Sequence, residues 1–351
     1  MKKMLIIQSR ILHYRKAFFN ELSNSFDLTV IHSGKATVNS NDRYREIITK
    51  ERKIGPFFVQ NKIFKSFIDD KYDIVIAEGN LRYIISILLS IFMQNKCRFG
   101  FWGTYLGTNV IVNKFWKYYT KHRNIFHLFY SKHDMEIFEK FNVGENKLFL
   151  ANNTFHVQKR IKSFEASEKK LILFVGSLDA RKELHVLIQA FAEILYGIPS
   201  NIDLAIVGDG VENAKLQNQV KTLNLQDRVK FYGQITELEI LEDLYKRAYF
   251  SVSFGQAGLS VLQSFAYGVP YLTKINSISG GEKYNIIQNK TGFFCQDNIE
   301  SLKYYMLLLI LNTELRHHLS KQCYEHYTYN CSLSAMTDGF INASKLNTNA
   351  I

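Results

Sequence analysis

Short apolar runs alternate along the chain with stretches whose apolar residues recur at helical spacing. The first run, residues 4–7, precedes a helical pattern carrying Phe18, Phe19 and Leu22, and a second run follows at 26–31. This strand–helix–strand order predicts a parallel, Rossmann-like sheet. Further runs predict strands at 72–77, 97–102, 125–130, 147–150, 171–175, 204–207, 229–232 and 249–253. Residues 41–71 are basic with only a weak helical pattern, and we expect them to be irregular. The chain is therefore expected to be an α/β protein.

One stretch, residues 249–270, combines a strand, a small-residue turn and a short helix. Gly255 and Gly258 frame the turn, the apolar positions of 259–266 have helical spacing, and Gly268 and Pro270 end the helix. A helix reached through a glycine turn presents free N–H groups and the positive end of its dipole, which suits a phosphate. A simple packing turn in an α/β domain explains the same residues equally well.

A second stretch has the same organisation with added charge. The buried strand 171–175 leads into a loop that carries Arg181 and Lys182, and a helix with an apolar face follows. Basic residues at the carboxyl end of a strand, ahead of a helix, favour an anionic ligand. The alternative is a solvated loop end with two chance basic residues.

Length and charge point to two unlike halves. The 351 residues suit two domains. Residues 1–160 hold 26 Lys and Arg against 13 Asp and Glu, and the remainder holds 18 against 19, so the net charge of +12 lies in the first half. A basic half suits nucleic acid, an anionic membrane or an anionic substrate, and no nucleic-acid-binding motif is present.

The cysteines and the apolar segments bear on location. The four cysteines form no Cys-x-x-Cys pair, so we expect reduced thiols in a cytoplasmic protein. The apolar run at the N-terminus is too short for a signal peptide, and residues 83–93 are too few to span a bilayer of about 30 Å. Residues 111–124 combine Ile111, Phe115, Tyr118 and Tyr119 with lysines, which is typical of an interfacial helix and equally of an ordinary domain helix.

Five blocks together resemble the second domain of the family 4 glycosyltransferases, which are retaining enzymes of the GT-B fold. The blocks are the loop 176–182, Val207–Gly210, Val229–Gly233, the stretch 249–270 and Thr291–Phe294, and the resemblance covers residues 168–340. It implies two Rossmann-like parallel-sheet domains facing across a cleft. Residues 1–160 would bind the acceptor, 161–335 the nucleotide-sugar, and 336–351 would form a helix or tail packing back on the first domain.

The resemblance also implies a set of site residues and a donor. The diphosphate of a UDP- or GDP-linked sugar would meet catalytic charges from Lys182 and Arg181. The implied donor-binding residues are Gly176, Ser177, Gly208, Gly233, Gly255, Gln256, Gly258, Leu259, Ser260 and Gln263, and the acceptor-side residues are Tyr14, Arg15, Trp102 and Thr104. For the acceptor-side pair, the alternative is that Tyr14 packs and Arg15 is solvated.

Three departures from the family pattern affect these roles. The Glu-x7-Glu signature falls on Gly255 and Gln263, so the sugar-facing glutamate is missing and the ribose contact falls to an amide. Ser177 replaces the usual basic residue, and Thr104 replaces a histidine. No Asp-x-Asp triplet occurs, which argues against a metal-dependent enzyme of the GT-A type. Fixed donors would then meet the leaving-group charge, with no metal or other cofactor.

The expected function is retaining transfer of a hexosyl group from a nucleotide-sugar to a glycan or a polyprenyl-diphosphate-linked acceptor of a surface polysaccharide, such as O-antigen or capsule. We expect a cytoplasmic protein, peripheral at the anionic inner-membrane face, with no nucleic-acid partner. A nucleotide-sugar 2-epimerase of the GT-B fold and a non-catalytic glycosyltransferase partner are the two alternatives. The missing glutamate counts against the epimerase and favours the non-catalytic partner.

Overall fold

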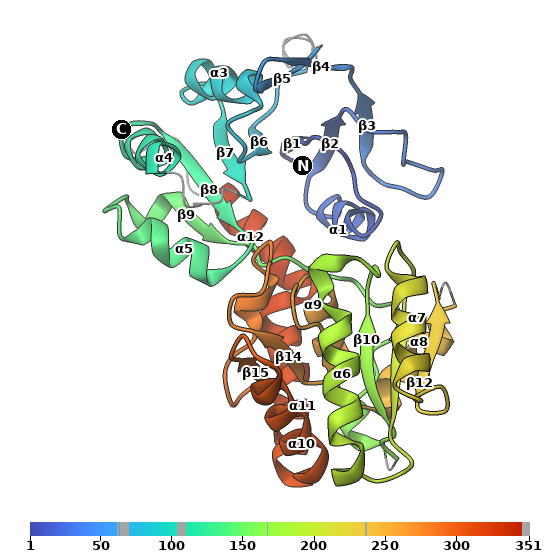
Figure 1. The fold of residues 1–351 in the computed structure, drawn as a ribbon. Coiled ribbons are helices and arrows are strands. Elements are labelled where there is room, and N and C mark those ends of the chain that lie inside the picture. The colour runs from blue at the N-terminus through green and yellow to red at the C-terminus, as the bar shows by residue number, and fades with distance from the viewer. Residues whose placement is uncertain (62, 64–69, 104–109, 167, 236, 346–351) are drawn as a thin grey trace. The chain divides into compact units, whose positions relative to one another are not determined.

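The computed structural model describes the chain except residues 62, 64–69, 104–109, 167, 236 and 346–351. It divides into two compact units: unit 1 comprises Met1–His156 with Leu333–Ile351, and unit 2 comprises Val157–Ser332. The boundaries expected at 160 and 335 lie within a few residues of these. Each unit is an α/β domain built on its own parallel sheet (Figure 1).

The sheet of unit 1 has seven parallel strands in the order β3-β2-β1-β6-β7-β8-β9. They are β1 (Lys3–Ile7), β2 (Asp27–His32), β3 (Arg45–Ile48), β6 (Ile74–Glu78), β7 (Arg98–Trp102), β8 (Ile125–Phe129) and β9 (Leu148–Leu150). The sheet is extended in one direction from β1 through β2 and in the other through β6. The carboxyl ends of β1 and β6 therefore form the switch point at which such sheets place ligands.

Residues 41–71, expected to be irregular, contain three strands. β3 adds an edge to the sheet, and β4 (Glu51–Ile54) pairs antiparallel with β5 (Phe57–Gln60) around Gly55, whose φ is +57°. All four residues of β4 are exposed, so its sequence lacks the alternation that marks a half-buried strand. This exposure explains why the pattern did not predict it.

Five described helices cover unit 1: α1 (Arg15–Leu22), α3 (Ile84–Met93), α4 (Val110–His122), α5 (Lys132–Glu139) and α12 (Leu333–Lys345). The C-terminal helix α12 packs on α1 and β9. A Cβ at Gly339 would lie 2.2 Å from the carbonyl oxygen of Leu150, so only glycine allows this close approach. Among the described residues, no helix is long and apolar enough to cross a membrane.

Unit 2 has a six-stranded parallel sheet in the order β12-β11-β10-β13-β14-β15. Its strands are β10 (Leu171–Val175), β11 (Asp203–Val207), β12 (Val229–Gly233), β13 (Ala248–Val252), β14 (Tyr271–Lys274) and β15 (Gly292–Cys295). The short strands β14 and β15 were not predicted; β15 begins at Gly292, within the block Thr291–Phe294. The switch point of this sheet lies between β10 and β13.

The helices of unit 2 are α6 (Leu184–Ile194), α7 (Asn213–Thr222), α8 (Leu238–Arg247), α9 (Leu259–Ala266), α10 (Ile299–Leu311) and α11 (Thr313–His326). Helix α6 packs against α7 and α10, and α9 packs against α11. Leu187, Ile188 and Phe191 of α6 are fully buried in the core, as their helical spacing predicts. The four cysteines of the protein are buried free thiols, and burial raises the pKa of Cys97 and of Cys295 to about 12.

Candidate functional site

Three glycines lie at the carboxyl edge of the unit 2 sheet, and we call them the glycine floor. Gly176, Gly208 and Gly233 follow or end the adjacent strands β10, β11 and β12, and the N–H of Gly208 donates to the Gly233 carbonyl at 2.7 Å. A Cβ at Gly208, where φ is +130°, would lie 1.8 Å from the Gly176 carbonyl oxygen. The backbones of residues 176 and 208 approach so closely that a side chain at 208 is excluded.

In the loop after Gly176, one of the two basic residues, Arg181, forms an ion pair with a carboxylate of the same loop. Asp179 accepts hydrogen bonds from Nε and Nη2 of Arg181, both at 3.0 Å, and one from Ser177 Oγ at 2.7 Å. These hydrogen bonds, that from Arg181 first, lower the pKa of Asp179 to about 2. Arg181 is therefore a neutralised and largely exposed cation, and the Ser177 hydroxyl is also committed to this pair.

Lys182 differs from its neighbour in burial and in pairing. Its residue is only 9% exposed, and its Nζ lies 3.8 Å from where a Cβ on Gly176 would be. Within the described chain its ammonium group forms no hydrogen bond and no ion pair. Burial lowers the pKa of Lys182, and the carboxylates of Asp179 and Glu282 act against this effect. Lys182 is thus a nearly buried cation beside the glycine floor, and it can bind an anion there.

The turn at Gly255–Gly258 delivers the amino end of α9 to the same edge. Residue Ile278 holds the turn, because its N–H donates to the Gly255 carbonyl and its carbonyl accepts from the Ala257 N–H, both at 2.9 Å. Ser253 Oγ donates to the carbonyl of Gln256 at 2.7 Å. The N–H groups of Gly258, Leu259 and Ser260 have no acceptor among the described residues. The turn and the helix end form as the sequence predicts, including Gly268 after the helix at φ +68°.

Two residues of α9 predicted to bind the donor, Ser260 and Gln263, differ in whether their side chains are already hydrogen-bonded within the protein. Ser260 Oγ is 2.7 Å from the hydroxyl of the buried Tyr271, so this side chain is engaged in the core and only its N–H is available. Gln263 is 7% exposed, and no described residue hydrogen-bonds its side-chain amide. An amide so placed can accept a bond from a ligand hydroxyl.

The sequence did not indicate that the Glu183 side chain lies against Gly255. A Cβ at this position would be 2.3 Å from the Arg181 carbonyl oxygen and 2.7 Å from Cγ of Glu183. The Glu183 carboxylate in turn binds Nζ of Lys274 at 2.7 and 2.9 Å. Glu183 and Lys274 are 91 residues apart in sequence, so no local pattern could have paired them.

The acceptor-side role of Tyr14 and Arg15 stays a prediction, whereas the alternative, in which Arg15 is solvated, is wrong. Arg15 is 5% exposed and is not solvated; its guanidinium lies 4.5 Å from the Trp102 ring centroid, 5.1 Å from that of Tyr14 and 5.0 Å from that of Tyr130. Its Nη1 also contacts Met336 Sδ at 3.7 Å. The cation is therefore sandwiched between aromatic rings at the amino end of α1, where cation–π attraction replaces hydration. Tyr14 is half-buried in the same cluster.

Trp102, also predicted on the acceptor side, is enclosed in the core of unit 1. It is 1% exposed and packs on Phe18 and Phe340, with ring centroids 5.6 and 5.0 Å away. An indole enclosed in this way holds the core beneath Arg15 and presents no surface to an acceptor. Thr104, the fourth acceptor-side residue, lies outside the described residues.

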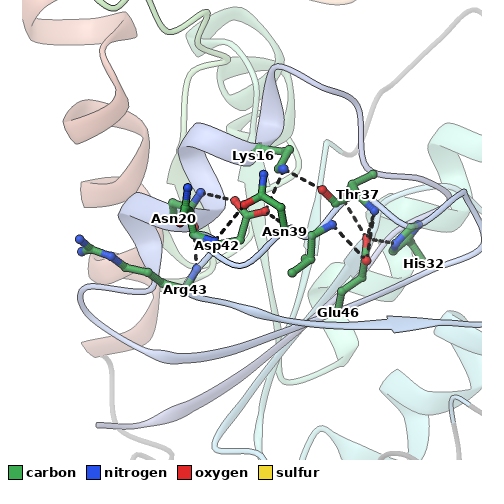
Figure 2. A network of polar contacts seen from close by, with 10 residues as sticks. Lys16, Asn20, His32, Thr37, Asn39, Asp42, Arg43 and Glu46 are labelled. Atoms are coloured by element: carbon green, nitrogen blue, oxygen red, sulfur yellow. Dashed lines mark hydrogen bonds and ion pairs between the residues drawn. The ribbon is translucent and has the colours of Figure 1, made fainter.

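A polar network fixes the loop that follows β2 (Figure 2). The Glu46 carboxylate receives bonds from the Thr37 N–H and hydroxyl and contacts His32 Nε2 at 2.8 Å. Burial alone would raise the pKa of Glu46, but the bonds from Thr37 and His32 keep it below its ordinary value. Lys16 of α1 binds Asp42 at 2.8 Å. The loop is thereby tied to α1 at the carboxyl edge of the unit 1 sheet.

Helix α4 only partly matches its predicted amphipathic face. Trp116, Tyr119 and Thr120 are buried in unit 1, whereas Ile111 and Tyr118 are 79% and 68% exposed. The predicted apolar face is therefore divided: Tyr119 points into the core and Tyr118 into solvent. The exposed side carries Ile111 and Tyr118 together with Lys114, Lys117 and Lys121.

The two parallel-sheet units define the GT-B fold. The structure resembles that of a glycosyltransferase from Rickettsia africae, with a TM-score of 0.75, 16% identity and 98% of each chain covered. It also resembles Anabaena HepE in complex with UDP, with a TM-score of 0.72, 13% identity, and 97% of this chain and 98% of that chain covered.

Residues 157–326 match the family model "Glycosyl transferases group 1". A Campylobacter jejuni protein, named GalNAc-alpha-(1->4)-GalNAc-alpha-(1->3)-diNAcBac-PP-undecaprenol alpha-1,4-N-acetyl-D-galactosaminyltransferase, is 32% identical over 195 residues, 52% of this chain and 49% of that protein. The chain spans about half the length of the curated relatives it matches. Residues 157–326 are thus similar to the group 1 glycosyltransferases, and the likeness to solved structures shows the fold.

Proposed function

We propose that the protein transfers a sugar from a nucleotide-sugar, with retention of configuration, and that unit 2 binds the donor. Lys182 carries this proposal: a cation 9% exposed, without an ion pair in the described chain, beside the glycine floor and the turn that leads into α9. A diphosphate supplies the missing negative charge. The fold neighbour that was crystallised with UDP adds support for a uridine diphosphate donor.

The proposed chemistry uses fixed positive charge. As the bond between the sugar C1 and the phosphate oxygen breaks, negative charge builds on the leaving diphosphate. Lys182 and the N–H groups at Gly258–Ser260 meet that charge, and such preorganised donors stabilise the transition state more than the ground state. The acceptor hydroxyl forms the new bond to C1 from the same face, and its proton passes to the leaving phosphate. No divalent cation is required, so transfer is expected to persist in EDTA.

The acceptor is proposed to be a lipid-linked glycan of a surface polysaccharide, such as O-antigen or capsule. The name of one similar protein, from Campylobacter jejuni, specifies a PP-undecaprenol-linked glycan. The exposed lysines and apolar residues of α4 suit an anionic membrane surface on which such acceptors lie. Unit 1, which holds the excess of basic residues, is the proposed acceptor domain, at the cytoplasmic face of the membrane.

Thermal shifts of the purified protein with UDP-, GDP- and other nucleotide-sugars identify the donor, and transfer to a polyprenyl-diphosphate-linked glycan then tests the activity. A shift together with transfer supports the proposal. The absence of a side chain at Gly255 favours one alternative, a non-catalytic partner of other glycosyltransferases. That alternative predicts neither transfer nor hydrolysis of any donor. A 2-epimerase instead converts the free nucleotide-sugar, which NMR of the sugar detects.

A further inference from the structure

Glu183 has a backbone conformation that side chains seldom adopt. It joins the short 3-10 turn Ala180–Lys182 to α6 with φ +53° and ψ 40°, in the left-handed region. A residue other than glycine, asparagine or aspartate in this region is uncommon, and its backbone is strained there. Other contacts of Glu183 must therefore compensate.

The side chain of Glu183 fills the space that Gly255 leaves open. A Cβ at Gly255 would lie 2.7 Å from Cγ and 2.8 Å from Cδ of Glu183. A side chain at residue 255 would therefore meet the Glu183 side chain as well as the Arg181 carbonyl oxygen. In this chain the Glu183 side chain occupies that space.

Lys274 holds this carboxylate from the end of β14. Its Nζ is 2.7 and 2.9 Å from the two Glu183 oxygens and 3.0 Å from Oδ1 of Asp297. Its own N–H donates to the Phe254 carbonyl at 3.1 Å. The Lys274 side chain is only 12% exposed, so the ion pair is better shielded from solvent than a surface pair. We name Glu183, Lys274 and Asp297 the carboxylate clamp.

The clamp acts on the residue that the proposed mechanism needs. The carbonyl of Lys182, one residue before Glu183, accepts a hydrogen bond from the Gly255 N–H at 3.1 Å. Lys182 is therefore held between the clamp and the turn that leads to α9. Releasing Glu183 frees the strained backbone at 183 to relax, and this moves the adjacent Lys182.

We propose that Glu183 and Lys274 are positioning residues that aim the Lys182 ammonium at the leaving diphosphate. The inference rests on the proposed function. It assigns the clamp a role in the rate of transfer beyond its role in folding, because misplacement of a catalytic group by about 1 Å costs on the order of 100-fold in rate.

The test compares Lys274→Met with Lys303→Met. Lys303 is a matched control: its Nζ also joins two carboxylates, Glu193 and Glu300, each at 2.8 Å, away from the site on α10 and α6. Lys274→Met is expected to lower kcat about 10- to 100-fold with a donor KM within about threefold of wild type. Lys303→Met is expected to keep wild-type kinetics. Glu183→Gln, which keeps the shape and removes the charge, is expected to behave like Lys274→Met, and Lys274→Arg to recover most of the rate.

A double-mutant cycle shows whether the clamp acts through Lys182. In a Lys182→Ala background, Lys274→Met is expected to reduce kcat less than about twofold further, since the group being positioned is gone. Additive losses would overturn the proposal, as would a Lys274→Met enzyme as active as Lys303→Met. Failure of the proposed function looks different: wild-type protein then transfers no sugar, or Lys182→Ala alone leaves transfer unchanged.

Discussion

Asp179 and Arg181 form a two-point ion pair inside the loop that follows β10, with Nε and Nη2 of the guanidinium each 3.0 Å from a different carboxylate oxygen. The adjacent Lys182 has no such partner among the residues described. The charge of Arg181 is thus paired with a carboxylate and that of Lys182 is not, although the sequence predicted the same catalytic role for both. The charge that remains for a ligand is that of Lys182.

This asymmetry predicts unequal effects of two alanine substitutions. Lys182→Ala is expected to lower kcat about 100- to 1,000-fold, the usual cost of losing one fixed donor to transition-state charge. Arg181→Ala is expected to cost less than about fivefold, since an exposed ion pair contributes little. Transfer kinetics with the donor found by thermal shift measure both. Wild-type turnover in Lys182→Ala would remove the main support for the functional assignment.

Gln263 is expected to contribute to donor binding in both the ground and transition states. Gln263→Ala removes a nearly buried acceptor for ribose hydroxyls, so the donor KM should rise while kcat changes little. Gln263→Glu restores a charged acceptor and is expected to preserve or improve binding. Calorimetric titration with the donor or with UDP measures the affinities. A fall in kcat without a change in KM in Gln263→Ala would contradict the assignment.

Gly255→Glu is expected to lower activity rather than restore it. The new Cβ would meet the Arg181 carbonyl and the Glu183 side chain at distances below 3 Å, so the loop carrying Lys182 must shift. Combining it with Glu183→Gly removes one of the two clashes and relaxes the backbone at 183, so the double variant should be more active than Gly255→Glu alone. Transfer rates and unfolding temperatures of the wild type and of these two variants check this. A fully active Gly255→Glu protein would show that the space is not contested.

Membrane association is expected to depend on the exposed side of α4. Each of Lys114, Lys117 and Lys121 contributes about 1 kcal/mol of attraction to an anionic surface. Changing all three to Glu should abolish sedimentation with anionic liposomes and leave transfer to a soluble acceptor intact. The same change at Lys215, Lys221 and Lys230, exposed lysines of unit 2, is the control. Unchanged sedimentation of the α4 variant would make α4 an ordinary domain helix.

The stability of unit 1 is expected to fall in mild acid because of His127. Complete burial lowers the pKa of His127 to about 3, so the unfolded chain binds a proton in the range from about pH 6.5 down to 3 that the folded chain does not. Stability is therefore unaffected above about pH 6.5 and falls as the pH drops below it, by about 2 kcal/mol between pH 7.5 and pH 5.

His127→Phe is expected to reduce this dependence, measured as the free energy of unfolding of the full chain in urea at both pH values; the buried His326, whose pKa burial lowers to about 4, keeps its share. The exposed His185, changed to Gln, serves as the control and should keep the wild-type slope. An unchanged slope in His127→Phe would assign the acid sensitivity to other groups.

The sequence by itself determined the α/β class, most of the long strands and the two glycine turns of unit 2. These features depend on neighbours a few residues apart: apolar runs that become buried strands, and glycines where the backbone turns. It did not predict β3, β4 and β5, because short or fully exposed strands carry no alternating pattern. Nor did it predict β14, only four residues long.

Only the tertiary structure decided the state of the site residues. Trp102 and Arg15 were predicted from the sequence as acceptor-side residues, and the packing of α1, β7 and α12 encloses both. The same holds for the pair Glu183 and Lys274, which comes together because β10 and β14 lie on either side of β13 in one sheet. The charge and accessibility of a side chain depend on atoms brought near it by folding, and those atoms belong to residues far away in the sequence.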